Sequence, residues 1–199
     1  MKKSKILIIL GIPIILLIIS IIMFIIINFQ IIKNIEQQPI IDNKISIKAK
    51  EIHDYMRENN YGYCTYDHRC NHAGGCGLNI TFETSKENFH NTCCATYVSW
   101  VLQETGYITK QEHIDKNLNG ANNLIKYLDK KGWKPIDKKD IMPGDILCYN
   151  SHIAIYGGRG MQYDAGNKKL LEQEAPCKVS GGMNPMKVLR APEIVNLVQ

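Results

Sequence analysis

The sequence has no strong excess of charge of either sign. Its formal net charge is +5, and setting aside the three lysines of residues 1–5 leaves +2. Domains that bind nucleic acid hold its phosphates with a markedly basic surface, which this composition does not supply. We therefore expect no nucleic-acid partner and only a mild attraction to anionic surfaces.

Repeats and metal-binding spacings are also missing. The sequence shows no internal repeat, and no low-complexity segment beyond one apolar run near its N-terminus. The stretch CTYDHRCNHAGGC brings Cys64, Cys70 and Cys76 together with two histidines, but five residues separate each cysteine from the next. Structural zinc sites usually have gaps of about two to four residues. We therefore expect no metal site and no cofactor, and favour disulfides for these cysteines.

An apolar run covers residues 6–28 and contains no charged residue. A helix rises ~1.5 Å per residue, so this run is long enough to cross the roughly 30 Å hydrocarbon core of a bilayer. Signal peptides have shorter apolar regions, of about 7–15 residues, and end at a small-x-small cleavage site. No such site follows here, so the run predicts an uncleaved signal-anchor that spans the lipid bilayer as a transmembrane helix.

The charges around this run predict its orientation. Three lysines precede it, whereas the segment just after it carries only Lys33 together with two acidic residues. By the positive-inside rule, residues 1–5 are cytoplasmic and the rest of the chain lies outside the cell. We expect residues 29–44 to form a tether and residues 45–199 to form one domain of ordinary size.

The first part of this domain has helical spacing. Ile45, Ala49, Ile52 and Met56 recur at the interval of one helix face. Residues 61–91 are rich in Gly, Asn, Thr, Cys and His and show no sustained period, which predicts a long irregular segment.

Two more helices and then a group of strands are expected further along the chain. One helix should run from an N-cap at Asn91 or Thr92 to a stop at Gly106, and another should lie within NNLIKYLDKKGW. The segments GDILCYN, HIAIYGG, MQYDAG and KVLRAP are short, rich in Ile, Val and Tyr, and separated by turn residues. Helices followed by strands predict an α+β domain with an antiparallel sheet.

Cys94 lies at the start of the second predicted helix. Unpaired backbone N–H groups and the helix dipole favour a thiolate there. A helix end supplies only ~0.3–1 kcal/mol, so activating a thiol also needs a cation such as an imidazolium. His152 is the candidate, because it opens a predicted strand that follows the Pro143–Asp145 turn.

The segments CCATYVSWVL, KKGW, MPGDILCYNSHIAIYGG and MQYDAGN resemble the NlpC-type cell-wall peptidases of the papain-like cysteine peptidase superfamily. The resemblance covers the whole outer domain and implies a papain-like fold, with N-terminal helices packed on an antiparallel β-sheet. It implies that Cys94 is the nucleophile, with Tyr97 and Val98 in matching positions. Cys93 stands where the family usually has Asp.

The same resemblance implies the other two site residues. His152 matches the general base at the start of the strand after the Pro-Gly-Asp turn, and Asp164, twelve positions on, matches the residue that orients it. The family more often has His, Asn or Gln at this third position, which leaves Asn167 and Gln162 as alternatives. The mechanism implied is acyl transfer by the Cys94 thiolate, with a second oxyanion donor from residues 61–91.

The hairpin register tests whether Asp164 can reach His152. The two lie directly opposite each other if the ladder is centred on Gly158, with an odd loop such as Gly157 to Arg159 and a glycine bulge. A two-residue turn at Gly158 and Arg159 would instead point Asp164 to the other face of the sheet.

Seven cysteines are an odd number, so at least one thiol has no disulfide partner within the chain. If Cys94 is the unpaired thiol, the other six can form three disulfides of unknown connectivity: Cys64, Cys70, Cys76, Cys93, Cys148 and Cys177. Cys93 is expected to be either a disulfide partner or a packed thiol.

The expected protein is a membrane-anchored, extracytoplasmic peptidoglycan hydrolase. The resemblance implies stem peptides as substrate, typically the bond between D-γ-glutamate and a diamino acid. One alternative is an amidase or endopeptidase of the related CHAP group, and another is a disulfide-tied surface module without catalysis.

Overall fold

The computed structural model describes residues 16–30, 43–64, 81–88, 90–178 and 184–192. The chain divides into two compact units, Met1–Gln38 and Pro39–Gln199. In the first unit, residues 16–30 are helical and their apolar side chains are exposed. Residues 6–15 of the predicted anchor and 31–42 of the predicted tether lie outside the described residues. Within the described ranges, no helix is both long and apolar enough to cross a membrane.

The second unit begins with helices and ends with strands. Its helical elements are α2 (Lys44–Glu58), α3 (Phe82–Asn88), α4 (Cys94–Glu104), α5 (Lys110–Asp115), α6 (Ala121–Lys130), the 3-10 turn η1 (Lys138–Asp140) and α7 (Lys168–Leu171). Its strands are β1 (Gly62–Tyr63), β2 (Asn91–Thr92), β3 (Lys134–Pro135), β4 (Ile146–Tyr149), β5 (His152–Gly158), β6 (Met161–Tyr163) and β7 (Lys187–Arg190).

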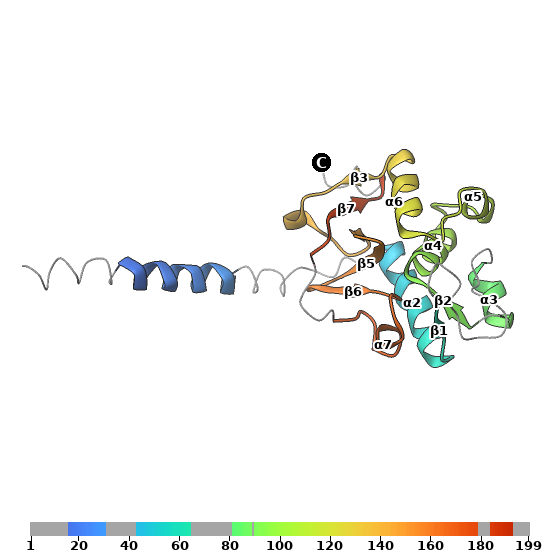
Figure 1. Ribbon diagram of the computed structural model, residues 1–199, viewed down its shortest axis with the longest axis horizontal. Coiled ribbons are helices and arrows are strands. Elements are labelled where there is room, and N and C mark those ends of the chain that lie inside the picture. The colour runs from blue at the N-terminus through green and yellow to red at the C-terminus, as the bar shows by residue number, and fades with distance from the viewer. Residues whose placement is uncertain (1–15, 31–42, 65–80, 89, 179–183, 193–199) are drawn as a thin grey trace, which may run out of the picture. The chain divides into compact units, whose positions relative to one another are not determined.

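One antiparallel sheet has the strand order β3-β7-β4-β5-β6, and β1 and β2 form a separate parallel pair. Helices α2, α4 and α6 lie on one side of this sheet and contact β5 (Figure 1). The main core lies between these helices and the sheet, and the opposite face carries a smaller apolar cluster around Leu147, Ala154, Tyr156 and Val188. The fold is therefore of the predicted α+β class, with helices packed on an antiparallel sheet.

The first predicted helix face is confirmed. Helix α2 buries Ile45, Ala49, Ile52 and Met56, which all belong to the main core. Its N-cap is Asn43, whose Oδ1 accepts backbone hydrogen bonds from the first turn at 3.0 and 2.9 Å.

The predicted N-cap of α4 is wrong. Asn91 and Thr92 pair with β1 as strand β2, and the cap is Cys93, whose Sγ accepts from the Thr96 backbone N–H at 3.5 Å. The helix ends as predicted just before Gly106, which has a left-handed φ of 78°. A thiol therefore serves as the cap in place of the oxygen that usually does so.

All four predicted strands are present, as β4, β5, β6 and β7. The irregular segment expected at residues 61–91 is wrong in part, because β1 and the seven-residue helix α3 lie within it. Residues 65–80 and 89 of this segment lie outside the described residues.

The turn at Pro143–Asp145 connects three parts of the domain. Gly144 has a left-handed φ of 91°, and an added Cβ there would collide with the side chain of Asn43. The Asn43 amide donates to the Pro143 carbonyl, so the start of α2 is attached to this turn. The buried Asp145 carboxylate accepts two hydrogen bonds from Arg190 of β7, at 2.8 and 2.7 Å. The turn that precedes β4 and β5 is therefore fixed from both sides.

Candidate active site

Cys94 is the first residue of helix α4 and is 8% exposed. Its thiol is hydrogen-bonded to the side chain of His152, the first residue of β5. The structure thus brings the two predicted residues into contact, although 58 positions separate them in the sequence. A thiol at a helix start beside an imidazole is the arrangement that favours a nucleophilic thiolate.

Asp164 completes a three-residue cluster. Its Oδ2 lies 2.9 Å from His152 Nε2, and its side chain is 1% exposed while that of His152 is 28% exposed. Because Nε2 is bound to Asp164, the other ring nitrogen, Nδ1, is the one available to Cys94. The order Cys94, His152, Asp164 is the arrangement of nucleophile, base and orienting group.

The surroundings of His152 keep it charged at neutral pH. Burial acts to lower the pKa of His152, but its hydrogen bonds to Asp164 and Cys94, with their Coulombic attraction, raise it from 6.5 to about 10. An imidazolium is the cation that a thiolate at this helix end requires.

The turn of the β5–β6 hairpin differs from both registers considered above. Its two central residues are Arg159 and Gly160, with φ of 52° and 70°, enclosed by the paired Gly158 and Met161. Two successive positive φ values are typical of a type I′ turn. The ladder then shifts by one residue at Gly157, which forms a β-bulge. The loop is therefore not Gly157–Arg159, but a glycine bulge, which was expected with it, is present.

The bulge places Asp164 on the His152 side of the sheet. Beyond it Ile155 pairs with Tyr163, so continued alternation puts Asp164 opposite Ala154, on the face that His152 shares. Asp164 is thus diagonal to His152 instead of directly opposite, a separation that a long side chain can bridge. Without the bulge the pairing would move by one residue and Asp164 would point to the other face.

Gly166 supports this contact and was missed from the sequence. Its backbone N–H donates to Asp164 Oδ1 at 2.6 Å. A Cβ on Gly166 would lie 2.5 Å from His152 Cε1 and 2.9 Å from Asp164 Oδ1. The lack of a side chain therefore leaves room for the imidazole ring.

The two alternatives to Asp164 have other positions. Gln162 is buried and its amide donates to Asp164 Oδ2, so it lies behind the carboxylate. Asn167 is exposed, and its Oδ1 accepts from the backbone N–H of Leu170 at 3.0 Å, at the start of α7. Of these three residues, Asp164 is the one that the structure places on His152.

The expected set of three disulfides is wrong, because Cys93, Cys148 and Cys177 are buried free thiols, as is Cys94. Cys93 is instead the packed thiol that was the other expectation, and burial raises its pKa. Cys64 is disulfide-bonded. Cys70 and Cys76 lie outside the described residues.

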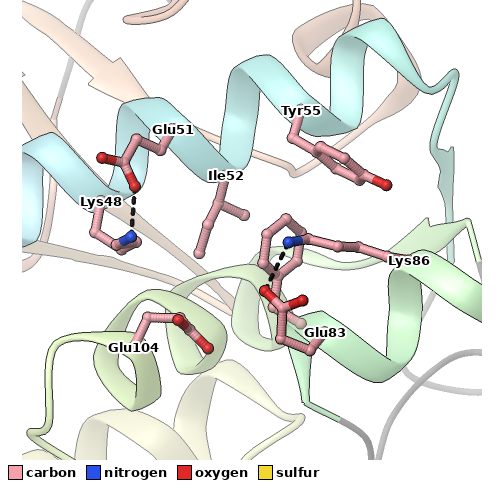
Figure 2. Close-up of a pocket in the computed structure, with 8 residues that line it drawn as sticks. Lys48, Glu51, Ile52, Tyr55, Glu83, Lys86 and Glu104 are labelled. Atoms are coloured by element: carbon pink, nitrogen blue, oxygen red, sulfur yellow. Dashed lines mark hydrogen bonds and ion pairs between the residues drawn. The ribbon is translucent and has the colours of Figure 1, made fainter.

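A separate pocket of about 150 Å³ lies between α2, α3 and α4, and none of the three clustered residues lines it (Figure 2). Its polar side chains are largely paired with one another. Lys48 pairs with Glu51, and Lys86 pairs with Glu83 at 2.6 Å while lying over the Phe82 ring. We assign no role to this pocket. In the part of the chain that the structure describes, no group of three or more His, Cys, Asp or Glu side chains is placed to hold a metal ion.

No family model matches this chain, and neither the curated proteins nor the solved structures contain a match to it. The resemblance to NlpC-type peptidases therefore stays a prediction, and the site geometry carries the functional conclusion.

Proposed function

We propose that this protein is a cysteine peptidase of the papain-like superfamily, and that it hydrolyses an amide bond in peptidoglycan stem peptides. The observation that carries the proposal is the contact of three residues from separate segments. Cys94 at a helix start is hydrogen-bonded to His152, and His152 lies 2.9 Å from the buried carboxylate of Asp164.

Each of these residues has a defined task in the proposed reaction. The Cys94 thiolate attacks the amide carbonyl carbon, and the electron pair of the carbonyl moves to its oxygen. When this intermediate collapses, the His152 imidazolium gives its proton to the leaving amine, and a thioester remains on Cys94. His152 then takes a proton from water, and the resulting hydroxide attacks the thioester carbonyl. The C–S bond breaks, the product acid leaves and loses its proton to solvent, and the Cys94 thiolate and His152 imidazolium are restored. Asp164 keeps the imidazole oriented throughout.

The oxyanion needs hydrogen-bond donors that are aimed at it. The backbone N–H of Cys94, in the first turn of α4, is one such donor, because N–H groups at a helix start have no partner within the helix. The second donor expected from residues 61–91 stays a prediction, since residues 65–80 and 89 lie outside the described residues.

An extracytoplasmic, membrane-anchored location is part of the proposal. Support comes from the lysines of residues 1–5, from the apolar run that follows them, and from the exposed apolar helix at residues 16–30. The disulfide of Cys64 fits an oxidising compartment.

Digestion of purified peptidoglycan tests the proposal. The wild-type chain and Cys93→Ser should both release soluble peptides, since serine retains a capping oxygen, while Cys94→Ala should fall to the background rate. Lysis by Cys94→Ala at the wild-type rate would contradict the proposed nucleophile. The mass of the products then separates cleavage within the stem peptide from the sugar–peptide cleavage of an amidase, and no digestion by any variant would favour the non-catalytic surface module.

A further inference from the structure

A row of hydrogen-bonded side chains lies behind His152. The Tyr149 hydroxyl donates to Gln162 Oε1 at 2.6 Å, and the Gln162 amide donates to Asp164 Oδ2. The same Oδ2 accepts from His152 Nε2 at 2.9 Å. Gln162 and Asp164 are each 1% exposed. We call these four residues the polar row.

The sheet fixes the backbone of the polar row. Gln162 is opposite Tyr156 of β5, and on its other side it exchanges two backbone hydrogen bonds with Cys177, of 3.0 and 2.6 Å. Alternation along the strand puts Gln162 and Asp164 on the same face. Strand β5 lies between β4, which carries Tyr149, and β6, which carries Gln162. On the face that these side chains share, β5 carries the small side chain of Ala154. The Tyr149 ring therefore has room to reach across β5.

The direction of each hydrogen bond in the polar row is determined. An amide has one accepting oxygen and one donating nitrogen, and an ionised carboxylate accepts only. Because the Asp164 carboxylate accepts only, the Gln162 nitrogen must face it, and the Gln162 oxygen then accepts from the Tyr149 hydroxyl. The reverse orientation would place the amide oxygen against the carboxylate, which is repulsive. Tyr149 thus holds the amide in the orientation that serves Asp164.

We propose that Tyr149 and Gln162 are positioning residues, which hold the Asp164 carboxylate against His152 and so maintain the proton on the imidazole. This deepens the proposed function, on which it rests, because the ring that it holds is the proposed base and proton donor. Tyr149 has a second contact with that ring, since the two ring centroids are 5.5 Å apart.

The other titratable groups around His152 and Asp164 stay neutral where the test is made. These groups are Tyr149 of β4, Tyr97 of α4, His53 of α2 and Cys177 of the segment after α7. Two charged residues of α2, Asp54 and Arg57, also act on Cys177 by Coulombic interaction. Burial lowers the pKa of His53, raises that of both tyrosines, and raises that of Cys177 to about 12. A fall in Cys94 reactivity between pH 7 and 10 therefore reports on His152, because ionisation of the thiol itself would raise the rate.

The test is the pH profile of Cys94 alkylation by iodoacetate, on the full chain in detergent, with the labelled cysteine identified by mass spectrometry. Iodoacetate is an anion, so its reaction with the thiolate is helped by the imidazolium and slows when His152 loses its proton. The wild-type rate should fall as the pH approaches about 10, the pKa of His152. In Gln162→Met this fall should occur at a pH lower by about half a unit or more, because a loosened Asp164 holds the imidazolium less well.

Tyr149→Phe keeps the aromatic ring and removes only the hydroxyl, so it should shift the profile in the same direction by less. Tyr149→Phe also tests the proposal if Gln162→Met fails to fold. Gln111→Met is the matched control, because Gln111 makes a similar bond of 2.7 Å to Asp115 on the exposed helix α5. This control should reproduce the wild-type profile.

A profile that does not move in Gln162→Met and Tyr149→Phe, or that moves to higher pH, would overturn the proposal, even if thermal stability drops. A different result would count against the proposed function. If the labelling profile shifts as expected but peptidoglycan is not hydrolysed by the wild-type chain, the positioning role stands and the substrate assignment does not.

Discussion

Gly166 is the residue at which the smallest change should have the largest chemical effect. A methyl group there would meet His152 Cε1 at 2.5 Å, so Gly166→Ala should push the imidazole off its position between Cys94 and Asp164. Misplacing a catalytic group by about 1 Å costs on the order of a hundredfold in rate. We expect a drop of about that size in iodoacetate labelling at pH 7, measured beside Asn167→Ala. Asn167 is an exposed neighbour, and its replacement should leave the rate unchanged.

The raised pKa of His152 also has a consequence for stability. The folded protein holds this proton up to about pH 10, whereas the unfolded chain releases it near 6.5. The stabilisation is therefore complete below pH 6.5 and is lost as the pH rises from there to about 10. Urea unfolding should show a decrease in the free energy of unfolding over this window. The same decrease in His152→Gln would show that another group is responsible.

At the scale of single elements, the cap of α4 is open to test. Cys93→Ala removes the side-chain N-cap of this helix and should lower the free energy of unfolding by about 1 kcal/mol. Cys93→Ser keeps an acceptor for the Thr96 N–H and should stay close to the wild type. Urea unfolding monitored by circular dichroism measures both, and equal loss in the two variants would mean that burial, and not capping, is what Cys93 supplies.

The helices and strands were predictable from the sequence where apolar residues recur at a helical interval or where a segment is rich in β-forming residues. The apolar interval of α2 and the β-rich segments β4 to β7 are confirmed, because burial on one face imposes those patterns. Helix α3 is too short to show a period. The cap at Cys93 was not predictable, since thiols are not among the usual cap residues. The cluster of Cys94, His152 and Asp164 was anticipated from the family resemblance, but its diagonal register was not, because glycines at 157, 158 and 160 each allow a bulge or a turn.

At the scale of the whole second unit, the pair of Asp145 and Arg190 joins the last described strand to the turn that precedes β4 and β5. Both side chains are almost fully buried, at 2% and 5% exposure, and Arg190 also donates to the Asp140 carbonyl at 2.7 Å. Arg190→Met would leave the Asp145 carboxylate buried without its partner.

We expect Arg190→Met to lower the free energy of unfolding by about 3–5 kcal/mol, as measured in urea. The double variant with Asp145→Asn should recover part of this loss, because it removes the unpaired charge. A single variant within about 1 kcal/mol of the wild type would show that solvent reaches Asp145 and that the pair is not a main support of the sheet.

The bulge at Gly157 also imposes a parity rule on changes of length in the hairpin. Side chains alternate between the two faces of a strand. If the bulge and the two-residue turn are both kept, inserting or deleting one residue between Tyr156 and Met161 therefore moves Asp164 to the face away from His152. Deleting Gly157 itself closes the bulge and keeps the pairing of Tyr156 with Gln162. A change of two residues restores the face, although it shifts the pairing along the strand. In any natural or engineered variant of this chain that keeps the cluster, the loop between β5 and β6 should therefore change length by even numbers where the bulge and the two-residue turn persist, and an odd change should be accompanied by loss of the bulge or by a different turn.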